Sequence, residues 1–263
     1  MVLWGYIASF FIGLILGMLG SGGSILSIPI LVYLFSFDVV TAAGYSLFLV
    51  GATSLAGAIQ RLGSKTIDLR TAFSFGVPSV IAVFATRKWI VAAIPEVLIQ
   101  TSSFVLTRRL LILGLFAALM IVASVLMIWK RPTPSAKGDK AKLSLLILEG
   151  AFIGFLSGLV GAGGGFLIVP SLVFLARISF KEAVGTTLVI IACNSLIGFL
   201  GDVLNYQIDW RFLLVLTGIA VSGIFVGNLC SRHIPAQHLK RSFGWFTLFM
   251  GVGILIKESF FHQ

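Results

Sequence analysis

Charged residues are scarce in this chain. Asp, Glu, Lys and Arg make up 11% of its 263 residues, while 58% are hydrophobic and the mean hydropathy is +1.09. An ordinary soluble domain carries about 25% charged residues. Because so little polar surface cannot coat a water-soluble globule, the composition predicts a single membrane domain that lipid covers.

Acidic residues are scarcer still, with nine Asp and Glu against 19 Lys and Arg, so the formal net charge is +10. The basic residues stand singly or in pairs between apolar runs rather than along one polar face. In a membrane protein, basic residues placed in this way usually fix the orientation. Their placement therefore argues against a nucleic-acid partner.

The chain has only two cysteines, Cys193 and Cys230, both in apolar segments. No CxxC spacing and no Cys/His cluster occurs, so neither a zinc site nor a disulfide framework is indicated, and we expect buried free thiols. The sequence also lacks a Ser/His/Asp set and the basic n-region of a cleavable signal peptide. It predicts no enzyme, no metal site and no cofactor.

Several uncharged apolar segments are close to the ~20 residues that a membrane-spanning helix needs. They are Val39–Gln60, Leu110–Trp129, Ala183–Gly201 and Phe212–Ser231, with shorter candidates at Thr71–Thr86 and Ser242–Ile256. The segment Trp89–Thr107 contains Pro95 and Glu96, and we expect it to be interfacial or only partly embedded.

The first apolar segment is too long for one span. The 37 residues before Asp38 are uncharged. As one helix they would extend about 55 Å at ~1.5 Å per residue, against a hydrocarbon core of ~30 Å. Gly20-Ser21-Gly22-Gly23 offers a place to reverse, because glycine adopts positive φ readily. We predict a hairpin of two helices, near residues 3–18 and 24–36.

The same pattern returns in the second half of the chain. The segment Gly13–Leu34 aligns without a gap with Gly154–Leu175, and the same spacing persists to the pair Arg70 and Arg211. Roughly a third of the aligned positions are identical, which indicates duplication. We therefore divide the chain into a first repeat (1–130), a polar, basic cytoplasmic linker (131–142) and a second repeat (143–263).

The distribution of basic residues predicts the orientation. If each hairpin crosses the membrane an even number of times, one side holds 13 Lys or Arg and the other holds 6; a single crossing would give 10 and 9. The positive-inside rule favours the first topology, with the linker in the cytoplasm and both termini outside it. Each repeat then crosses an odd number of times, so the two repeats are inverted. The predicted fold is an all-α integral membrane protein of two inverted repeats, each with a glycine-tipped helical hairpin followed by spanning helices.

The glycine tips are candidates for an anion site. Helix N-termini carry partial positive charge and unpaired N–H donors, and we expect the second hairpin arms to begin at Ser24 and Gly165. We expect no Lys or Arg deep in a span, so backbone N–H groups would hold the anion. The candidate substrate-binding residues are Gly20, Ser21, Gly22, Gly23, Ser24, Gly161, Gly163, Gly164, Gly165, Ser54, Thr187 and Asn194.

Each of these assignments has a structural alternative. Glycines at small-xxx-small spacing, such as Gly13 and Gly17, serve close helix packing. Polar side chains in spans often bond a neighbouring helix, although Asn194 can also donate to an anion. A carboxylate in an apolar segment is costly, so Glu149 is a candidate for proton coupling or else reaches the nearby interface.

The paired motifs GMLGSGGSILSIP and GLVGAGGGFLIVP, with the following AAGYSL and AVGTTL, resemble the doubled signature of the sulfite exporter TauE/SafE family, also called the toluene sulfonate uptake permeases. The resemblance covers nearly the whole chain. It implies a transporter of small sulfur-containing anions, such as sulfite, sulfonates or sulfoacetate, in a bacterial inner membrane. It does not distinguish export from import.

The sequence thus favours a multi-pass secondary transporter in the plasma membrane, with a small anion and the lipid bilayer as partners. A second copy of the chain, as a homodimer, is a further candidate partner. The alternatives are an anion channel and a membrane-embedded scaffold or enzyme, and saturable or exchanging flux would separate the transporter from the channel.

Overall fold

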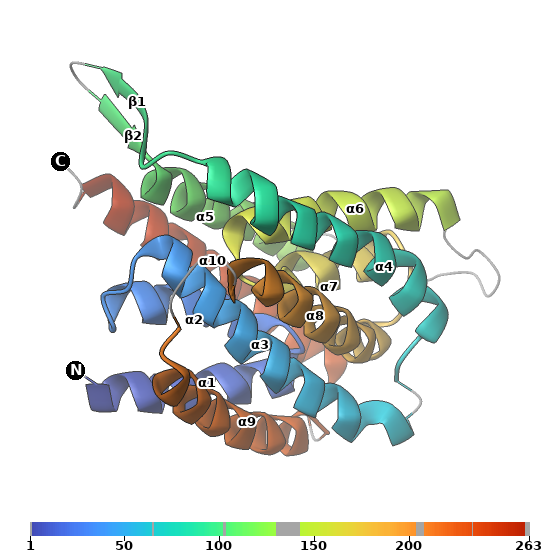
Figure 1. Ribbon diagram of the computed structural model, residues 1–263. Helices are drawn as coiled ribbons and strands as arrows, with labels where there is room; N and C mark the ends of the chain where they lie inside the picture. Colours follow the sequence, from blue (N-terminus) through green and yellow to red (C-terminus); the bar gives the residue numbers. More distant parts are fainter. Residues whose placement is uncertain are drawn as a thin grey trace.

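The computed structural model describes residues 2–64, 66–101, 104–129, 143–203, 208–232 and 234–260. In these ranges the α-helices are α1 (Val2–Leu19), α2 (Gly22–Tyr33), α3 (Val39–Arg61), α4 (Leu69–Ala85), α5 (Arg108–Trp129), α6 (Leu143–Val160), α7 (Gly165–Phe174), α8 (Phe180–Val203), α9 (Trp210–Arg232) and α10 (Ala236–Phe260). A 3-10 turn (Leu62–Ser64) follows α3, and a π-helical segment (Thr86–Val91) continues α4. The helices form one bundle, and α1 begins at the end of the bundle where α10 ends (Figure 1).

Seven described helices are long and apolar enough to cross a membrane. They are α3, α4 with its π-helical extension, α5, α6, α8, α9 and α10, so the all-α, multi-pass prediction is confirmed at this level. The segment expected to be interfacial contains a departure from helix. There β1 (Val97–Thr101) pairs antiparallel with β2 (Phe104–Thr107), and this β-hairpin projects from the end of the bundle (Figure 1).

The outer faces of the bundle are apolar. On α4 the exposed side chains Leu69, Phe73, Val77 and Ile81 recur every fourth residue and form one stripe along the helix. Large exposed hydrophobic residues also lie on α6 and α9. A water-soluble protein of this size would bury these faces, whereas lipid covers them without cost. The central helices are α3 and α8, the most deeply buried of the long ones.

The helices α1 and α2 form an antiparallel hairpin. A Cβ added at Gly23, in the first turn of α2, would overlap the carbonyl oxygen of Ile12 on α1. Near the other end of the hairpin, Gly5 lies against the ring of Phe35. The second arm spans Gly22–Tyr33 rather than the expected 24–36, so the helix starts two residues earlier. The corresponding arm in the second half, α7, starts at Gly165 as expected.

Helices from the two halves pack across one another in matching pairs. The first helix α1 packs against α9, and α6 packs against α4. A Cβ added at Gly13 would overlap the backbone oxygen of Ala220, and one added at Gly154 would overlap that of Ser79. The two contacts correspond in the alignment of the halves, because Gly13 aligns with Gly154 and, at the same spacing, Ser79 aligns with Ala220. These glycines therefore permit close approach of two backbones.

Candidate functional site

The two glycine-rich tips meet inside the bundle. A Cβ added at Gly165, the first residue of α7, would lie 2.7 Å from the Cβ of Ser21 at the first tip. A Cβ added at Gly163 would lie 2.5 Å from the Oγ of Ser195 and 3.2 Å from the side chain of Val50. Since Val50 and Ser195 belong to the middle parts of α3 and α8, the tips lie at the centre of the molecule.

The tips need glycine for their backbone as well as for their lack of a side chain. The φ angles are 74° at Gly20, 79° at Gly161, 67° at Gly163 and 68° at Gly164. Residues with a Cβ are strained in this left-handed region. The second tip holds three such residues, and α7 begins directly after them at Gly165, beside Ser21 of the opposing tip.

Buried polar atoms without a partner gather around the tips. Among the described residues, eight buried side-chain atoms lack a hydrogen-bond partner, and two of them, Glu149 Oε1 on α6 and Thr217 Oγ1 on α9, belong to other parts of the bundle. The other six are Ser21 Oγ, Ser157 Oγ and Ser195 Oγ, which contact the tips, and Ser54 Oγ, Thr187 Oγ1 and Asn194 Oδ1 on α3 and α8, the helices on which the tips pack. Their side chains are at most 1% exposed. Leaving one buried hydroxyl or amide oxygen unpaired costs about 1–3 kcal/mol, so such a group in a native protein calls for a ligand or water.

The three polar residues predicted on α3 and α8 are all buried, but they are used differently. Asn194 Nδ2 donates to Ser79 Oγ on α4 at 2.7 Å, so one end of its amide already bonds a neighbouring helix. Ser54 and Thr187 have no partner among the described residues. The hydroxyl of Ser157, which the sequence did not single out, lies against the second tip, 2.5 Å from a Cβ added at Gly164.

Two predicted tip residues are occupied inside their own hairpin. The hydroxyl of Ser24 donates to the carbonyl oxygen of Ser21 at 2.7 Å. Gly23 faces the backbone of α1 rather than the opposing tip. Gly20 and Gly161 pack on the first turns of α8 and α3, against Val184 and Ala43. Of the tip residues, Ser21, Gly163, Gly164 and Gly165 therefore border the unpaired polar atoms most directly.

A basic residue near the end of one span is buried in the protein. Arg87 is 1% exposed, and its Nε donates to Asp202 Oδ1 and Oδ2 at 3.0 and 2.9 Å. Its Nη2 also contacts Oδ2, which joins α4 to α8 by a buried ion pair. The guanidinium borders the second tip, since a Cβ at Gly161 would lie 3.2 Å from Nη1. A charge near the end of a span normally reaches water at the interface, whereas Arg87 is covered by α6 and α8.

A similar contact lies beside the first tip, where an arginine bonds the amide of an asparagine in place of a carboxylate. Arg61 on α3 donates to Asn228 Oδ1 on α9 from Nε at 3.0 Å and from Nη2 at 2.8 Å. Its Nη2 also donates to the carbonyl oxygen of Gly17 at 2.9 Å. When the alignment of the two halves is extended without a gap, Arg61 aligns with Asp202 and Arg87 aligns with Asn228. The two contacts therefore occupy equivalent positions in the two halves. This correspondence is the feature of the sequence that could have indicated them.

Three acidic residues lie away from the tips, and among them Glu149 is the candidate for proton coupling. Glu149 Oε2 accepts a hydrogen bond from Ser171 Oγ at 3.3 Å, and its Oε1 is buried with no partner in the described chain. Asp68 caps α4, because it accepts from the backbone N–H groups of Arg70 and Thr71. The carboxylate of Asp209 accepts from the N–H of Phe212 in the same way.

The expectation of buried thiols is wrong, since Cys193 and Cys230 are both exposed. On an apolar helix surface in a membrane, an exposed thiol faces lipid, which is as apolar as a protein interior. In the described chain, no group of three His, Cys, Asp or Glu residues could hold a metal ion.

An apolar exterior, a central set of polar groups and two broken helical hairpins define a multi-pass membrane protein with an internal polar site. The profile of the sulfite exporter TauE/SafE family matches residues 6–254, nearly the whole chain. The chain belongs to this family, and it is a membrane transporter rather than an enzyme.

Relatives of similar length agree with this assignment. A "Probable membrane transporter protein" of Xylella fastidiosa (strain 9a5c) is 28% identical over 251 residues, covering 93% of this chain and 91% of the relative. A similarly named protein of Methanocaldococcus jannaschii is 27% identical and covers 95% of this chain and 94% of its own length. The "Probable membrane transporter protein YdhB" of Bacillus subtilis (strain 168) is 27% identical, over 88% of this chain and 91% of the relative.

Proposed function

We propose that this protein is a secondary transporter for small sulfur-containing anions, such as sulfite, sulfonates or sulfoacetate, and that it holds them between its two glycine tips. The observation that carries the proposal is the set of buried, unpaired hydroxyl and amide groups around the tips. The hydroxyl groups of this set can each donate to an anion, whereas the unpaired atom of Asn194 is an amide oxygen that only accepts; none of the groups is a carboxylate, so no negative charge competes with the anion. The name of the family supports the class of substrate.

The chemistry suits a tetrahedral or pyramidal oxyanion. Ser21, Ser157 and Ser195 can each rotate a hydroxyl to donate to one anion oxygen, and the starts of α2 and α7 supply backbone N–H groups. A helix N-terminus contributes about 0.3–2 kcal/mol to binding of a negative charge. Several such donors together give micromolar to millimolar affinity, which suits a substrate that must also leave.

We propose that the two halves, residues 1–130 and 143–263, are inverted repeats joined by the linker. The packing of α1 on α9 and of α6 on α4 supports this, as does the constant spacing in sequence between matching contacts. Inverted repeats commonly place the substrate site between the halves and move one half against the other. The ion pair of Arg87 with Asp202 then closes the passage beside the second tip in this conformation.

We infer the orientation from the segments that share an end of the bundle and from the basic residues that they carry. Arg61, Lys181 and Leu239 line one pocket, so the segments around them lie together, as a hairpin that crosses an even number of times requires. These segments carry most of the basic residues. We therefore place that end in the cytoplasm and both termini outside it, in a bacterial inner membrane.

The test is flux into proteoliposomes that contain the purified protein. Labelled sulfite, sulfoacetate and taurine are each offered with and without a pH gradient. We expect saturable uptake that accelerates when unlabelled substrate is present on the far side; flux proportional to concentration without exchange would indicate an anion channel instead. Absence of protein-dependent flux for all three would reject the proposed class of substrate.

Coupling to protons is tested in the same vesicles with Glu149→Gln. If Glu149 carries the proton, the variant loses uptake driven by the pH gradient but keeps exchange. Unchanged pH dependence in the variant would assign Glu149 a structural role, bonded to Ser171.

A further inference from the structure

We propose that the pocket beside Arg61 is a second anion site, a vestibule in which a small oxyanion binds before it reaches the tips. The proposal rests on the proposed function for the class of anion. The pocket has a volume of about 160 Å³ and lies at the proposed cytoplasmic end of the bundle. It is lined by residues of α1, α3, α8, α9 and α10 and by Thr66, just before α4.

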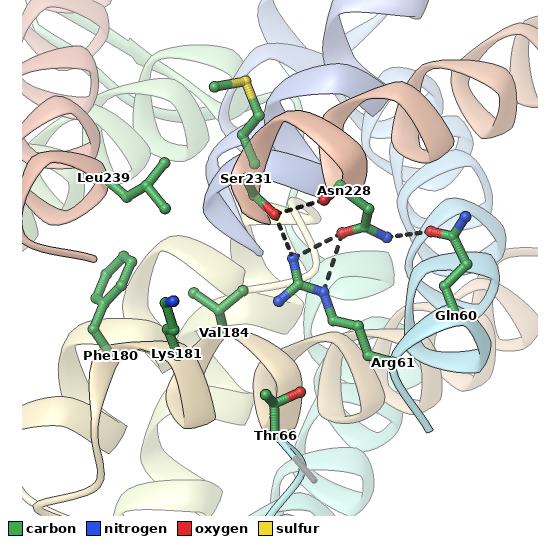
Figure 2. A pocket seen from close by; sticks show the side chains of 10 residues that line it. Gln60, Arg61, Thr66, Phe180, Lys181, Val184, Asn228, Ser231 and Leu239 are labelled. Carbon is green, nitrogen blue, oxygen red and sulfur yellow. Dashed lines mark hydrogen bonds between the residues drawn. The ribbon is translucent and has the colours of Figure 1, made fainter. Parts of the chain in front are cut away.

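The walls of this pocket differ in character. Figure 2 shows Arg61, Asn228, Gln60 and Ser231 joined by hydrogen bonds on one side, and Phe180 and Leu239 on the other. Two bonds to Asn228 and one to the carbonyl oxygen of Gly17 hold the Arg61 guanidinium in place. A cation held this way is already ordered before an anion arrives, so binding does not have to fix its side chain.

The charged residues that line the pocket have one sign. The lining contains Arg61 and Lys181 and no described Asp or Glu. Glu182 follows the lining residue Lys181 in the sequence, and its carboxylate accepts a hydrogen bond from the N–H of Ser179 at the start of α8. A concave site lined by one sign of charge raises the local concentration of the opposite ion.

A thin barrier separates this pocket from the tips. Val184 lines the pocket and also packs on the first tip, where a Cβ added at Gly20 would lie 2.5 Å from its Cγ1. Met18, in the last turn of α1, lines the pocket as well. An anion in the vestibule is therefore one side chain away from the proposed site, and a small shift of the first hairpin against α8 would connect the two.

The corresponding pocket at the opposite end of the bundle is different. It has a volume of only about 10 Å³ and is lined by Val40, Tyr45 and Asp202, among others. In the alignment of the two halves, Val40 stands where the vestibule has Lys181, and Asp202 stands where it has Arg61. The vestibule is consequently present at one end of the bundle and not at the other, and it attracts anions from the proposed cytoplasmic side.

The test uses charged thiol reagents and does not depend on transport. Cys193 and Cys230 are replaced by Ser, Thr66→Cys is introduced in the pocket, and the full chain is studied in nanodiscs so that both faces are accessible. A methanethiosulfonate with a sulfonate group is compared with one that carries a trimethylammonium group. The control is Gly63→Cys on the same end, where an added Cβ meets no atom within 4 Å.

We expect the ratio of anionic to cationic modification rates to be at least about tenfold higher at Thr66→Cys than at Gly63→Cys. Lys181→Gln and Arg61→Gln should each lower that ratio, whereas Arg70→Gln, outside the pocket, should not. Sulfate or methanesulfonate should slow the reaction at Thr66→Cys more than chloride at equal ionic strength; neither of them attacks the reagent, as sulfite would.

Equal ratios at the two cysteines, or a ratio that Lys181→Gln leaves unchanged, would overturn the vestibule. Lys181 is exposed and makes this test independent of the effect of Arg61→Gln on folding. Selectivity without sulfonate flux in proteoliposomes would keep the vestibule and reject the proposed function. Sulfonate flux without selective modification at Thr66→Cys would support the proposed function and reject the vestibule.

Discussion

Glycine serves two purposes in this protein, and the surroundings of each glycine separate them. Gly164 has a φ of 68° and an added Cβ would lie 2.5 Å from the hydroxyl of Ser157. Gly13 is helical, and an added Cβ would overlap the backbone oxygen of Ala220. The first glycine shapes the proposed site, whereas the second allows two helices to touch. Gly114 on α5 faces open space.

These surroundings predict different results for three substitutions. Gly164→Val should abolish transport, because the left-handed backbone costs a residue with a Cβ about 1–2 kcal/mol and the side chain displaces Ser157. Gly13→Ala should reduce the amount of folded protein, since the methyl group collides with backbone that cannot rotate away. Gly114→Val should leave both transport and the amount of folded protein unchanged. Fluorescence-detected size-exclusion chromatography and flux per folded molecule measure the two effects. Full transport by the Gly164→Val protein would contradict the role of the second tip.

At the scale of elements, the helices are tied together by a few polar contacts in an apolar bundle. Arg87 lies in the π-helical continuation of α4 and bonds Asp202 near the end of α8. Glu258 on α10 is buried and accepts from Tyr33 at the end of α2 and from Arg109 at the start of α5. In a membrane, such contacts position helices that apolar packing alone would let slide.

The buried pair predicts an asymmetry between breaking it and replacing it. Asp202→Asn leaves the Arg87 charge without its counterion, and we expect a loss of about 3–5 kcal/mol of stability. The double variant Arg87→Met with Asp202→Leu removes both charges and should recover most of that loss. Thermal unfolding midpoints in detergent measure the difference. A single variant as stable as the parent would mean that Arg87 reaches water.

At the scale of the whole molecule, the halves are interlocked rather than side by side. The first helix of each hairpin packs on a helix of the other half, α1 on α9 and α6 on α4. The tips of both hairpins therefore reach the shared centre, between α3 and α8. Motion of either hairpin moves a part of the proposed site, which is what a transporter built from two halves needs.

The proposed orientation predicts which reagents reach the linker. Lys137 lies in the linker, outside the described residues. In the cysteine-free protein, Lys137→Cys should react with a permeant maleimide in whole cells and resist an impermeant one, because the even-crossing topology puts it in the cytoplasm. Permeabilised cells provide the control for reactivity. Modification by the impermeant reagent in intact cells would invert the orientation.

The composition and the run of apolar segments determine that this is an α-helical membrane protein, because lipid sets the length and polarity of every span. The uncharged stretch before Asp38 also requires a break, and Gly20 to Gly23 is where the chain can make it. The helices α1 and α2 end and begin there. These conclusions need only local chemistry, so the sequence is sufficient for them.

Only the tertiary structure decided which polar groups share the centre and which are already paired. Nothing in the sequence around Arg87 indicates that its side chain is covered on every side, because that depends on α6 and α8 packing over it. The same packing leaves Ser157 and Ser195 unpaired beside the second tip while it gives Asn194 a partner in Ser79. The burial and the hydrogen-bond partners of a residue depend on helices that are far from it in the sequence, so the sequence around that residue does not determine them.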